Sequence, residues 1–496
     1  MGDHIYQLLV IGGGINGAGI AMDAAGRGLD VALCEMNDLG SATSSRSSKL
    51  IHGGLRYLEH YQFRLVREAL AEREVLLTMA PHIIWPLRFR LPHQPQLRPS
   101  WLIRAGLFLY DHLSRRNTLP ASYAVPLATG NPLKHHVQRC YEYSDGWVDD
   151  ARLVILNAMA ARDKGATILP RTRCIKATRV QNYWQVLLED SNSGQQYSVQ
   201  CSALVNAAGP WVSQVFKQAL EQPPPRQIRL VKGSHIVVPR LHQQPHAYIL
   251  QNDDRRIVFA IPYEDDFTLI GTTDVDYRGD PACVTISQAE IEYLINTSNR
   301  YFSQQLNHKD IIHSYAGVRP LLDSTAGHAQ AASRDYYLAL DNPPQQAPLL
   351  SVFGGKITTY RKLAQTAVDK LASHFPQAGP AWTEHSHLPG GDFSSQQVLQ
   401  QQLHDRFPWL PIPVLQRYVR SYGTLCTNFL DGCESVEDMG ATFGAGLFTC
   451  EVRWLQQYEW ARTTEDILWR RSKLGLRLTT QQEQTLARFL ASSQPV

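Results

Sequence analysis

A glycine-rich turn near the N-terminus limits the possible folds of this chain more than any other segment. The apolar residues 7–11 lead directly into G-x-G-x-x-G, formed by Gly12, Gly14 and Gly17, and small residues then continue at helical spacing. A strand, a tight turn and a helix with a small face place a pyrophosphate at the helix N-terminus. The first glycine permits the turn, the second lets the backbone approach phosphate, and the third allows the helix and strand to pack closely.

A second predicted strand supplies the acidic residue that this arrangement requires. Residues 26–28 should end the helix, and residues 30–35 form a predicted strand that closes with Glu35. A carboxylate about 20 residues after the glycines accepts a hydrogen bond from an adenosine ribose hydroxyl. Residues 5–36 therefore predict a Rossmann-type unit that binds an ADP-containing cofactor, and the motif alone leaves NAD and FAD open.

The composition argues against several other classes of protein. The 496 residues predict roughly two to four domains, and a formal charge of +3 gives no reason to expect nucleic acid as a partner. The eight cysteines are scattered without a C-x-x-C pair, so we expect reduced thiols and no metal site. No signal peptide is visible, and no run reaches the roughly 18 apolar residues that a transmembrane helix needs.

Strand-like and helix-like segments alternate to about residue 390, which predicts an α/β fold. The stretch 375–391 is rich in proline and glycine and marks the best candidate domain boundary. Beyond it the sequence has helical periodicity, and Thr463 to Asp466 has the pattern of a capping box. We predict a Rossmann-type cofactor domain with an inserted β-rich substrate domain over residues 1–389, and a helical C-terminal cap domain over residues 390–496.

The segment 97–116 mixes aromatic, aliphatic and arginine residues over the length of a helix. One interpretation is a helix that lies in a membrane interface, with Trp101 at headgroup depth and arginines on phosphates. The commoner alternative, which the residues by themselves favour, is an amphipathic helix packed on the protein's own core.

Three later segments favour the larger of the two cofactors. A hydroxyl-rich loop at 41–48 precedes His52-Gly53-Gly54, an apolar strand ends in small residues near 209, and another strand ends in Gly354-Gly355. Glycine lets a backbone lie flat against a ligand. An NAD site needs one nucleotide-binding unit, whereas contacts from distant parts of the chain suit FAD.

Longer stretches resemble the FAD-dependent glycerol-3-phosphate dehydrogenases of bacterial respiration, within the wider family of D-amino-acid-oxidase-like flavoproteins. The resemblance covers nearly the whole chain and rests on residues 11–19, 44–59, 143–153, 232–239, 270–275, 317–321 and 353–361. It implies oxidation of sn-glycerol 3-phosphate to dihydroxyacetone phosphate by hydride transfer to FAD. Together with the glycine motif it predicts these FAD-binding residues: Gly12, Gly13, Gly14, Asn16, Gly17, Glu35, Thr43, Ser44, Ser45, Lys49, His52, Gly53, Gly54, Ala208, Gly209, Gly354, Gly355, Lys356 and Thr358.

A phosphorylated polyol needs cations for its phosphate. Arginine suits phosphate because its planar guanidinium forms bidentate hydrogen bonds and keeps its charge. Arg319 and Lys356 are flanked by glycine or proline in apolar surroundings, which favours a functional role over a solvated surface charge. The resemblance implies that Arg56, Tyr57, Arg319, Arg334 and Lys356 surround the substrate; we add His235 to this site from its sequence context and expect Arg319 to take part in catalysis.

We expect a histidine to remove the proton of the substrate hydroxyl, since imidazole titrates near neutral pH. Two histidines stand out by context: His52, before two glycines, and His235, at the start of a predicted strand. The sequence gives no geometry, so the choice stays open; His52 could instead contact the flavin, and His235 could only orient the substrate.

A single dinucleotide fingerprint and the lack of an iron–sulfur cysteine run indicate a diffusible electron acceptor. The resemblance implies a membrane quinone and peripheral contact with the cytoplasmic face of the inner membrane, and it leaves a homodimer open. Three alternatives remain: a glycerol-3-phosphate oxidase that uses O2, an amine or amino-acid oxidase of the same fold, and a flavin-binding sensor without turnover.

Overall fold

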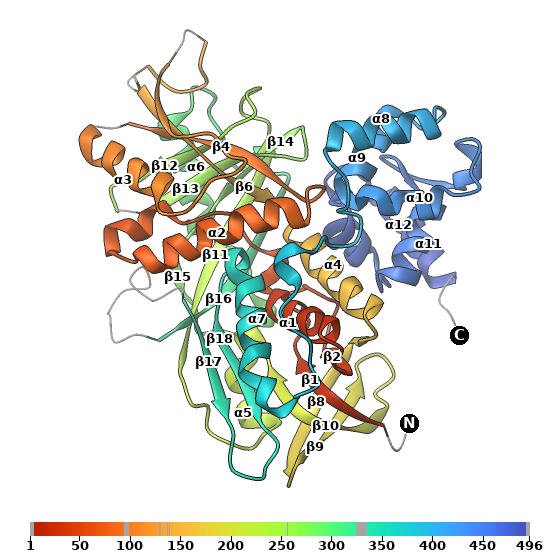
Figure 1. Cartoon of the computed structure of the whole chain (residues 1–496). Helices are drawn as coiled ribbons and strands as arrows, with labels where there is room; N and C mark the ends of the chain where they lie inside the picture. Colours follow the sequence, from red (N-terminus) through yellow and green to blue (C-terminus); the bar gives the residue numbers. More distant parts are fainter. Residues whose placement is uncertain are drawn as a thin grey trace.

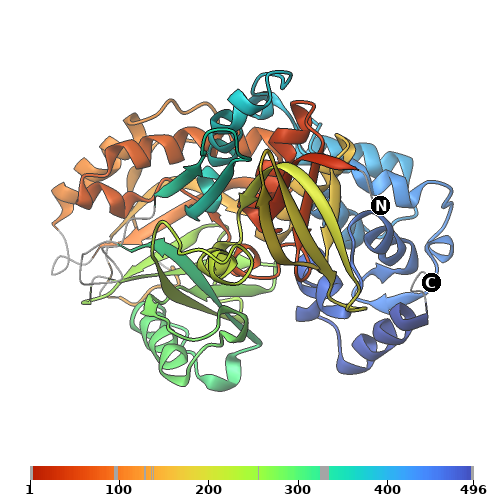
Figure 2. The same cartoon turned by 90° about the horizontal axis from the view of Figure 1, so that it is seen from below.

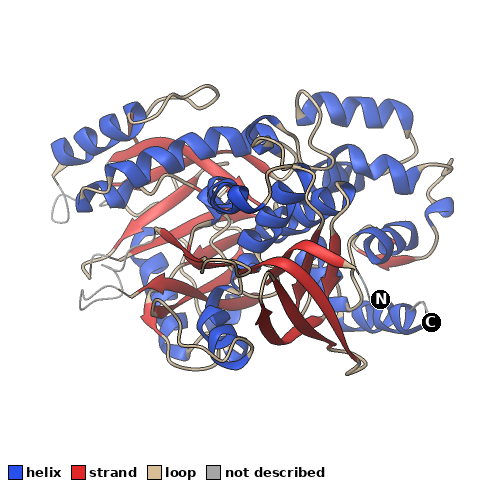
Figure 3. Cartoon of the chain, turned by 60° about the horizontal axis from the view of Figure 1, so that its bottom comes forward, coloured by secondary structure: helices blue, strands red, loops and turns tan. Residues whose placement is uncertain are grey.

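The structure of this chain, a computed structural model, describes residues 4–93, 99–127, 130–135, 137, 139–254, 256–323 and 335–492. Two large β-sheets lie in the middle of the molecule with helices around them (Figures 1 and 3). The C-terminal helices, blue in Figure 2, lie on the side of the molecule opposite to α2 (Phe63–Met79) and α3 (Ser100–His112).

The first sheet contains the predicted Rossmann-type unit. β1 (Ile5–Ile11), α1 (Ile15–Gly26) and β2 (Val31–Glu35) follow one another as the glycine motif predicts, and β1 pairs in parallel with both β2 and β10. The antiparallel pair β8–β9 continues from β10. The sheet order is β17 (Tyr336–Asp341), β18 (Leu349–Gly354), β10 (Gln196–Asn206), β1, β2, β7 (Thr167–Pro170), with β9 (Tyr183–Asp190) and β8 (Thr172–Val180) off this path.

Alternating side chains of β1 divide this sheet between two cores. Leu8 and Val10 pack toward α1, α4 (Asp150–Asp163) and α7 (Tyr360–Leu371), whereas Leu9 packs toward α5 (Val212–Gln218) on the other face. A Cβ on Gly19 would lie 2.8 Å from the ring of Tyr360, so glycine there permits the close approach of α7.

The second sheet is larger, mostly antiparallel, and covered by helices on both faces. Ile236 and Val238 of β11 pack toward α6 (Gln288–Tyr301), and Val237 packs toward the core that α2 and α3 complete. Its order is β15 (Val275–Asp276), β11 (Ile228–Pro239), β14 (Phe267–Gly271), β13 (Ile257–Tyr263), β12 (Ala247–Gln251), β4 (Ile84–Pro92), β6 (Arg139–Val148), β3 (Leu50–Ile51), with β16 (His313–Leu322) on β11 and β5 (Tyr123–Pro126) on β6. The predicted fold class, a Rossmann-type unit with a β-rich second part and a helical C-terminal part, is confirmed.

The C-terminal part consists mainly of helices, and the exact domain boundary stays a prediction. The predicted capping box is present: Thr463 N–H donates to Asp466 Oδ2 at 2.9 Å, and Asp466 N–H donates to Thr463 Oγ1 at 3.2 Å. It precedes a turn of π-helix, Asp466–Arg471, rather than an α-helix. The elements are α8 (Gln396–Arg406), α9 (Ile412–Tyr422), α10 (Cys426–Leu430), β19 (Thr442–Gly444), β20 (Leu447–Phe448), α11 (Thr449–Tyr458) and α12 (Thr480–Ser492).

In the part of the chain that the structure describes, every helix is too short or too polar to cross a membrane.

Candidate active site

A cavity of about 810 Å³ is lined by residues of both sheets and by the loops that follow their strands. The first sheet contributes the turn after β1 and the end of β2, and the second sheet contributes β16 and the loop after β14. Segments that are far apart in sequence therefore meet around one space. The predicted residues that line it are Gly12, Gly14, Asn16, Glu35, Thr43, Ser44, His52, Gly54, Arg56, Tyr57, Ala208, Gly209, Arg319, Gly354, Gly355, Lys356 and Thr358.

The first glycine turn is shaped as the motif requires. Gly12 has φ +109°, and a Cβ there would lie 2.6 Å from the Ala207 carbonyl oxygen. A Cβ on Gly17 would lie 1.9 Å from the Gly12 carbonyl oxygen, so Gly17 serves helix–turn packing behind the cavity. Gly13 N–H donates to Glu35 Oε2 at 2.7 Å. Gly13 and Gly17 therefore shape the turn without lining the cavity.

Glu35 lies at the end of β2 and faces the cavity. Burial raises the pKa of its carboxyl above the usual value and outweighs the N–H groups of Asn37 and Gly13, which lower it. A hydroxyl donor within the cavity would relieve this cost of burial, because a hydrogen-bonded carboxylate is easier to desolvate. The arrangement suits a ribose hydroxyl.

The loop after β2 supplies hydroxyl groups to the cavity. Ser44 Oγ accepts a hydrogen bond from the Ile15 N–H at 3.0 Å at the start of α1, and Thr43 Oγ1 donates to the Val318 carbonyl at 2.6 Å. Lys49 corrects our expectation, because its side chain is buried and its ammonium donates to Asp150 Oδ1 at 2.7 Å and not to the cavity. Lys49 is therefore a structural partner of the loop, and Ser45 likewise does not line the cavity.

The His52-Gly53-Gly54 turn is held from two sides. Thr358 Oγ1 accepts from His52 N–H at 3.2 Å and donates to the His52 carbonyl at 3.3 Å. Gly53 N–H donates to Tyr110 Oη at 2.8 Å, and a Cβ on Gly53 would lie 2.6 Å from Leu70. Gly53 is thus required for packing behind the cavity, whereas His52 lines it, with its ring centre 6.4 Å from that of Phe259, another lining residue.

Two features of the cavity fit FAD. Gly209 lines it with φ +53°, and a Cβ there would meet no protein atom within 4 Å, so this backbone faces open ligand space. Asn16 Oδ1 is buried and, among the described residues, has no hydrogen-bond donor. The first three residues of β8 (Thr172–Val180) line the cavity as well.

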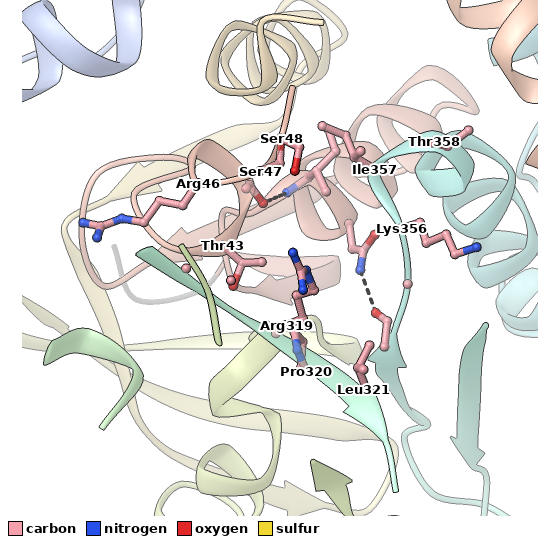
Figure 4. A pocket seen from close by; sticks show the side chains of 18 of the residues that line it. Thr43, Arg46, Ser47, Ser48, Arg319, Pro320, Leu321, Lys356, Ile357 and Thr358 are labelled. Carbon is pink, nitrogen blue, oxygen red and sulfur yellow. Dashed lines mark hydrogen bonds between the residues drawn. The ribbon is translucent and has the colours of Figure 1, made fainter. Parts of the chain in front are cut away.

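Cationic side chains lie at the part of the cavity drawn in Figure 4. Arg319 of β16 donates to Asp274 Oδ1 and, at 2.7 Å, to Thr272 Oγ1. The Lys356 ammonium lies 3.8 Å from the centre of the Tyr57 ring. Arg56 also lines the cavity. Arg334, the remaining predicted cation, lies outside the described residues.

His235 corrects the expectation that it contacts substrate. It is 1% exposed and does not line the cavity; its Nε2 is hydrogen-bonded to Ser48 Oγ at 2.9 Å. Burial, with Arg319 and Lys49 nearby, holds its pKa well below the usual value, so the imidazole is neutral. The side chain fits there because residue 271 is glycine, whose added Cβ would lie 2.1 Å from the ring. His235 thus supports Ser48, which does line the cavity.

Several lining residues were not predicted from the sequence. Thr272 and Asp274, which hold Arg319, belong to a strand end with the pattern Thr-Thr-Asp, and this polar ending was a usable signal. Thr172 and the apolar Leu102 and Leu109 of α3 gave no such signal, because only the fold brings them to the cavity.

Comparison with known proteins agrees with this geometry. Residues 7–361 match the model of the "FAD dependent oxidoreductase" family, and residues 381–493 match the "C-terminal domain of alpha-glycerophosphate oxidase". The chain is 56% identical to the glycerol-3-phosphate dehydrogenase of Pseudomonas aeruginosa, over 99% of this chain and 96% of that protein. It is 50% identical to the D-erythritol 1-phosphate dehydrogenase of Brucella abortus, over 95% of each.

A solved structure gives the same picture. The chain is similar to the glycerol-3-phosphate dehydrogenase from Bacillus halodurans in complex with FAD, with a TM-score of 0.77, 27% identity, and coverage of 99% of this chain and 91% of that one. FAD, the cofactor that the sequence predicts, is confirmed. The chain therefore belongs to the FAD dependent oxidoreductase family, in the branch that contains the glycerol-3-phosphate dehydrogenases.

Proposed function

We propose that this protein oxidises sn-glycerol 3-phosphate to dihydroxyacetone phosphate. The observation that carries the proposal is that several cations line one FAD-binding cavity, among them Arg56, Arg319 and Lys356. A phosphate dianion needs such fixed positive charge, whereas an amino-acid oxidase needs one cation for a carboxylate. The name of the relative from Pseudomonas aeruginosa supports the same substrate.

The residues around the cavity have separate tasks in this reaction. Arg319 and Lys356 bind the phosphate and so fix the distance of the C2 carbon from the cofactor. FAD, when bound, supplies the hydride acceptor. His52 accepts the proton of the C2 hydroxyl, and Asp274 and Thr272 keep the Arg319 guanidinium oriented. His235 acts indirectly, by holding Ser48.

Anaerobic bleaching of the bound flavin tests the substrate. We expect sn-glycerol 3-phosphate to bleach the flavin, and glycine and D-alanine to leave it oxidised. D-Erythritol 1-phosphate is a needed comparison, because the relative from Brucella abortus is named for that substrate. If only the erythritol phosphate bleaches the flavin, the substrate assignment is wrong; if no substrate does, the protein is a flavin-binding protein without this activity.

For the electron acceptor we propose a membrane quinone. Support comes from the rim of the cavity, where Tyr61, Phe63, Leu102 and Leu109 present apolar surface that is partly exposed. A quinone ring is apolar and suits such a rim. Reoxidation of the reduced enzyme by a soluble quinone analogue should exceed reoxidation by O2 in an oxygen electrode. Equal or faster reaction with O2 identifies an oxidase instead.

The same rim supports peripheral membrane contact, on the cytoplasmic face of the inner membrane. Trp101 is 70% and Phe108 62% exposed on α3, next to Leu102 and Leu109. The opposite face of α3 buries Ile103, Leu107 and Tyr110. Packing of α3 on the protein's own core therefore explains this buried face but not the exposed apolar one. Exposed apolar side chains gathered on one helix at a cavity mouth are typical of an interfacial helix.

A further inference from the structure

Residues 459–473 of the helical C-terminal part, which we call the C-terminal strap, pack beside the cofactor site. The strap contacts the loop at residues 36–49, here called the cofactor loop, and the elements that hold this loop. The cofactor loop contributes Thr43 and Ser44 to the cavity and follows directly on Glu35. The strap forms buried ion pairs with Asp38 of the loop itself and with Asp149, the N-terminal cap of the helix that holds the other end of the loop.

At the end near Glu35, the strap binds Asp38. Arg471 donates to both oxygens of Asp38, to Oδ1 at 2.9 Å, and Arg470 Nε donates to Oδ2 at 2.5 Å. Asp38 is 4% exposed, and Arg471 is fully buried. In the same stretch, Gly40 N–H donates to the Gly13 carbonyl at 2.9 Å. The two arginines thus fix the part of the loop that covers the first glycine turn.

A third strap residue, Asp466, reaches the start of β8, a strand that also lines the cavity. Its Oδ2 accepts from Arg171 at 2.5 Å, and its Oδ1 accepts from Arg470 at 2.5 Å. Arg171 N–H in turn donates to the Asn37 carbonyl at 2.8 Å. Asp466 therefore joins the cofactor loop to the start of β8, where Thr172 lines the cavity.

At the other end of the loop the strap acts through α4. Lys473 donates to Asp149 at 2.9 and 3.1 Å, and Asp149 accepts from the Arg152 N–H as the N-terminal cap of α4. The next residue, Asp150, accepts from Ser47 Oγ at 2.7 Å and from Lys49 at 2.7 Å. The strap thereby fixes the α4 N-terminus that holds the end of the cofactor loop.

Buried ion pairs add little net stability, but they fix the position of the groups that they join. We propose that the C-terminal strap is a clamp for the cofactor loop: it holds residues 36–49 in the FAD-binding conformation, so that the helical C-terminal part sets the affinity for FAD. Arg470, Arg471 and Lys473 are then positioning residues that touch neither substrate nor cofactor. The proposal depends on FAD binding alone and not on the identity of the substrate.

The variant Arg471→Met tests the clamp, with Arg417→Met as the matched control. Arg417, which is partly buried, forms a bidentate ion pair with the buried Glu451, at 2.5 and 2.7 Å, within the C-terminal helices. Apoprotein is titrated with FAD, the dissociation constant is read from flavin fluorescence, and the melting temperature of the apoprotein is recorded. We expect Arg471→Met to weaken FAD binding about tenfold or more, the factor that corresponds to one charged hydrogen bond.

The control separates a clamp from general destabilisation. Arg417→Met should lower the melting temperature while the FAD dissociation constant changes less than about twofold. Equal weakening of FAD binding in both variants, or none in Arg471→Met, overturns the proposal. If Arg471→Met does not fold, two other variants replace it: Arg471→Lys, which keeps the charge, and Lys473→Met, which releases the other end of the loop. The expected loss of FAD affinity and the outcome that overturns the proposal are the same for both.

Discussion

At the scale of single residues, the two histidines that the sequence singles out differ in their surroundings. His52 lines the cavity from a turn that Thr358 holds. His235 is enclosed on β11, stacks on Tyr315 with ring centres 4.8 Å apart, and bonds Ser48. A general base must reach the proton that it removes, so the geometry favours His52.

His52→Asn tests this assignment. We expect the rate constant of flavin reduction by sn-glycerol 3-phosphate to fall about 100-fold or more, the usual contribution of a general base. His235→Asn should have a smaller effect, because an amide still bonds Ser48. Both rate constants come from anaerobic stopped-flow reduction over pH 5–9. A larger loss in His235→Asn than in His52→Asn would contradict the assignment.

Arg319→Met tests the phosphate clamp. The variant removes a cation from the cavity while keeping an unbranched side chain, and charged hydrogen bonds contribute about 1.5–3 kcal/mol. We therefore expect the apparent dissociation constant for substrate in flavin reduction to rise about tenfold to 100-fold. Arg229→Met is the control, since Arg229 forms an ion pair with Asp276 on the outer part of the same sheet. An unchanged constant in Arg319→Met excludes this residue as a phosphate ligand.

At the scale of elements, α3 has two faces with different surroundings. Its inner face carries Tyr110, whose hydroxyl donates to Asp145 and accepts from Gly53 N–H, next to His52. Its outer face carries the exposed Trp101 and Phe108. One helix therefore joins the surface proposed for membrane contact to the turn that presents His52.

The double variant Trp101→Ala/Phe108→Ala should bind membranes more weakly. Removing two large apolar side chains from an interface costs about 1.5–3 kcal/mol each, so cosedimentation with phosphatidylethanolamine–phosphatidylglycerol vesicles should fall at least about tenfold. Flavin reduction in solution should change little, because neither residue lines the cavity. Val398→Ser/Ile412→Ser, at exposed positions on the C-terminal helices, is the matched control. Equal vesicle binding of wild type and the α3 variant excludes α3 as the docking element.

At the scale of the whole molecule, buried histidines make stability depend on pH. Burial, with Arg152 nearby, lowers the pKa of His82 to about 3, and burial lowers those of His242 and His313 to about 4. As the pH falls, such a histidine is protonated in the unfolded chain before it is protonated in the folded protein. Its contribution to the free energy of unfolding is therefore present above about pH 6.5 and is lost as the pH falls toward the pKa of the folded protein. Acidification from pH 7 to 4 should therefore destabilise the protein.

His82→Leu tests this dependence at one site. Its ring is fully buried, and neither ring nitrogen has a hydrogen-bond partner among the described residues. From the shift in pKa, wild type should lose about 2 kcal/mol at this site between pH 7 and 5. Urea unfolding of the variant at both pH values should show a fall in the free energy of unfolding that is about 2 kcal/mol smaller than in wild type. The control is Ile83→Val, at a neighbouring buried position, which should destabilise the protein equally at both pH values. An identical pH dependence in wild type and His82→Leu contradicts the argument.

The parts of the fold that the sequence predicts are those fixed by local pattern. The unit from Ile5 to Glu35 follows from glycine spacing and apolar runs, and the capping pair Thr463–Asp466 follows from a four-residue pattern. Lys49 could not be placed in this way. Its position in a polar, glycine-flanked loop is equally compatible with a ligand contact and with burial against Asp150, which lies 101 residues away.

The sequence by itself determined the dinucleotide-binding turn and the cations available for a phosphate, because each depends on residue types within a short segment, and the alternation of segments over the chain determined the fold class. Only the tertiary structure decided which of these residues face one cavity. His235 and Lys49 are buried against Ser48 and Asp150 and do not line it, whereas Arg319 of β16 and Lys356, which follows β18, both do. The structure also decided that the C-terminal strap reaches Asp38, since a contact across 433 residues follows from packing and not from any local pattern.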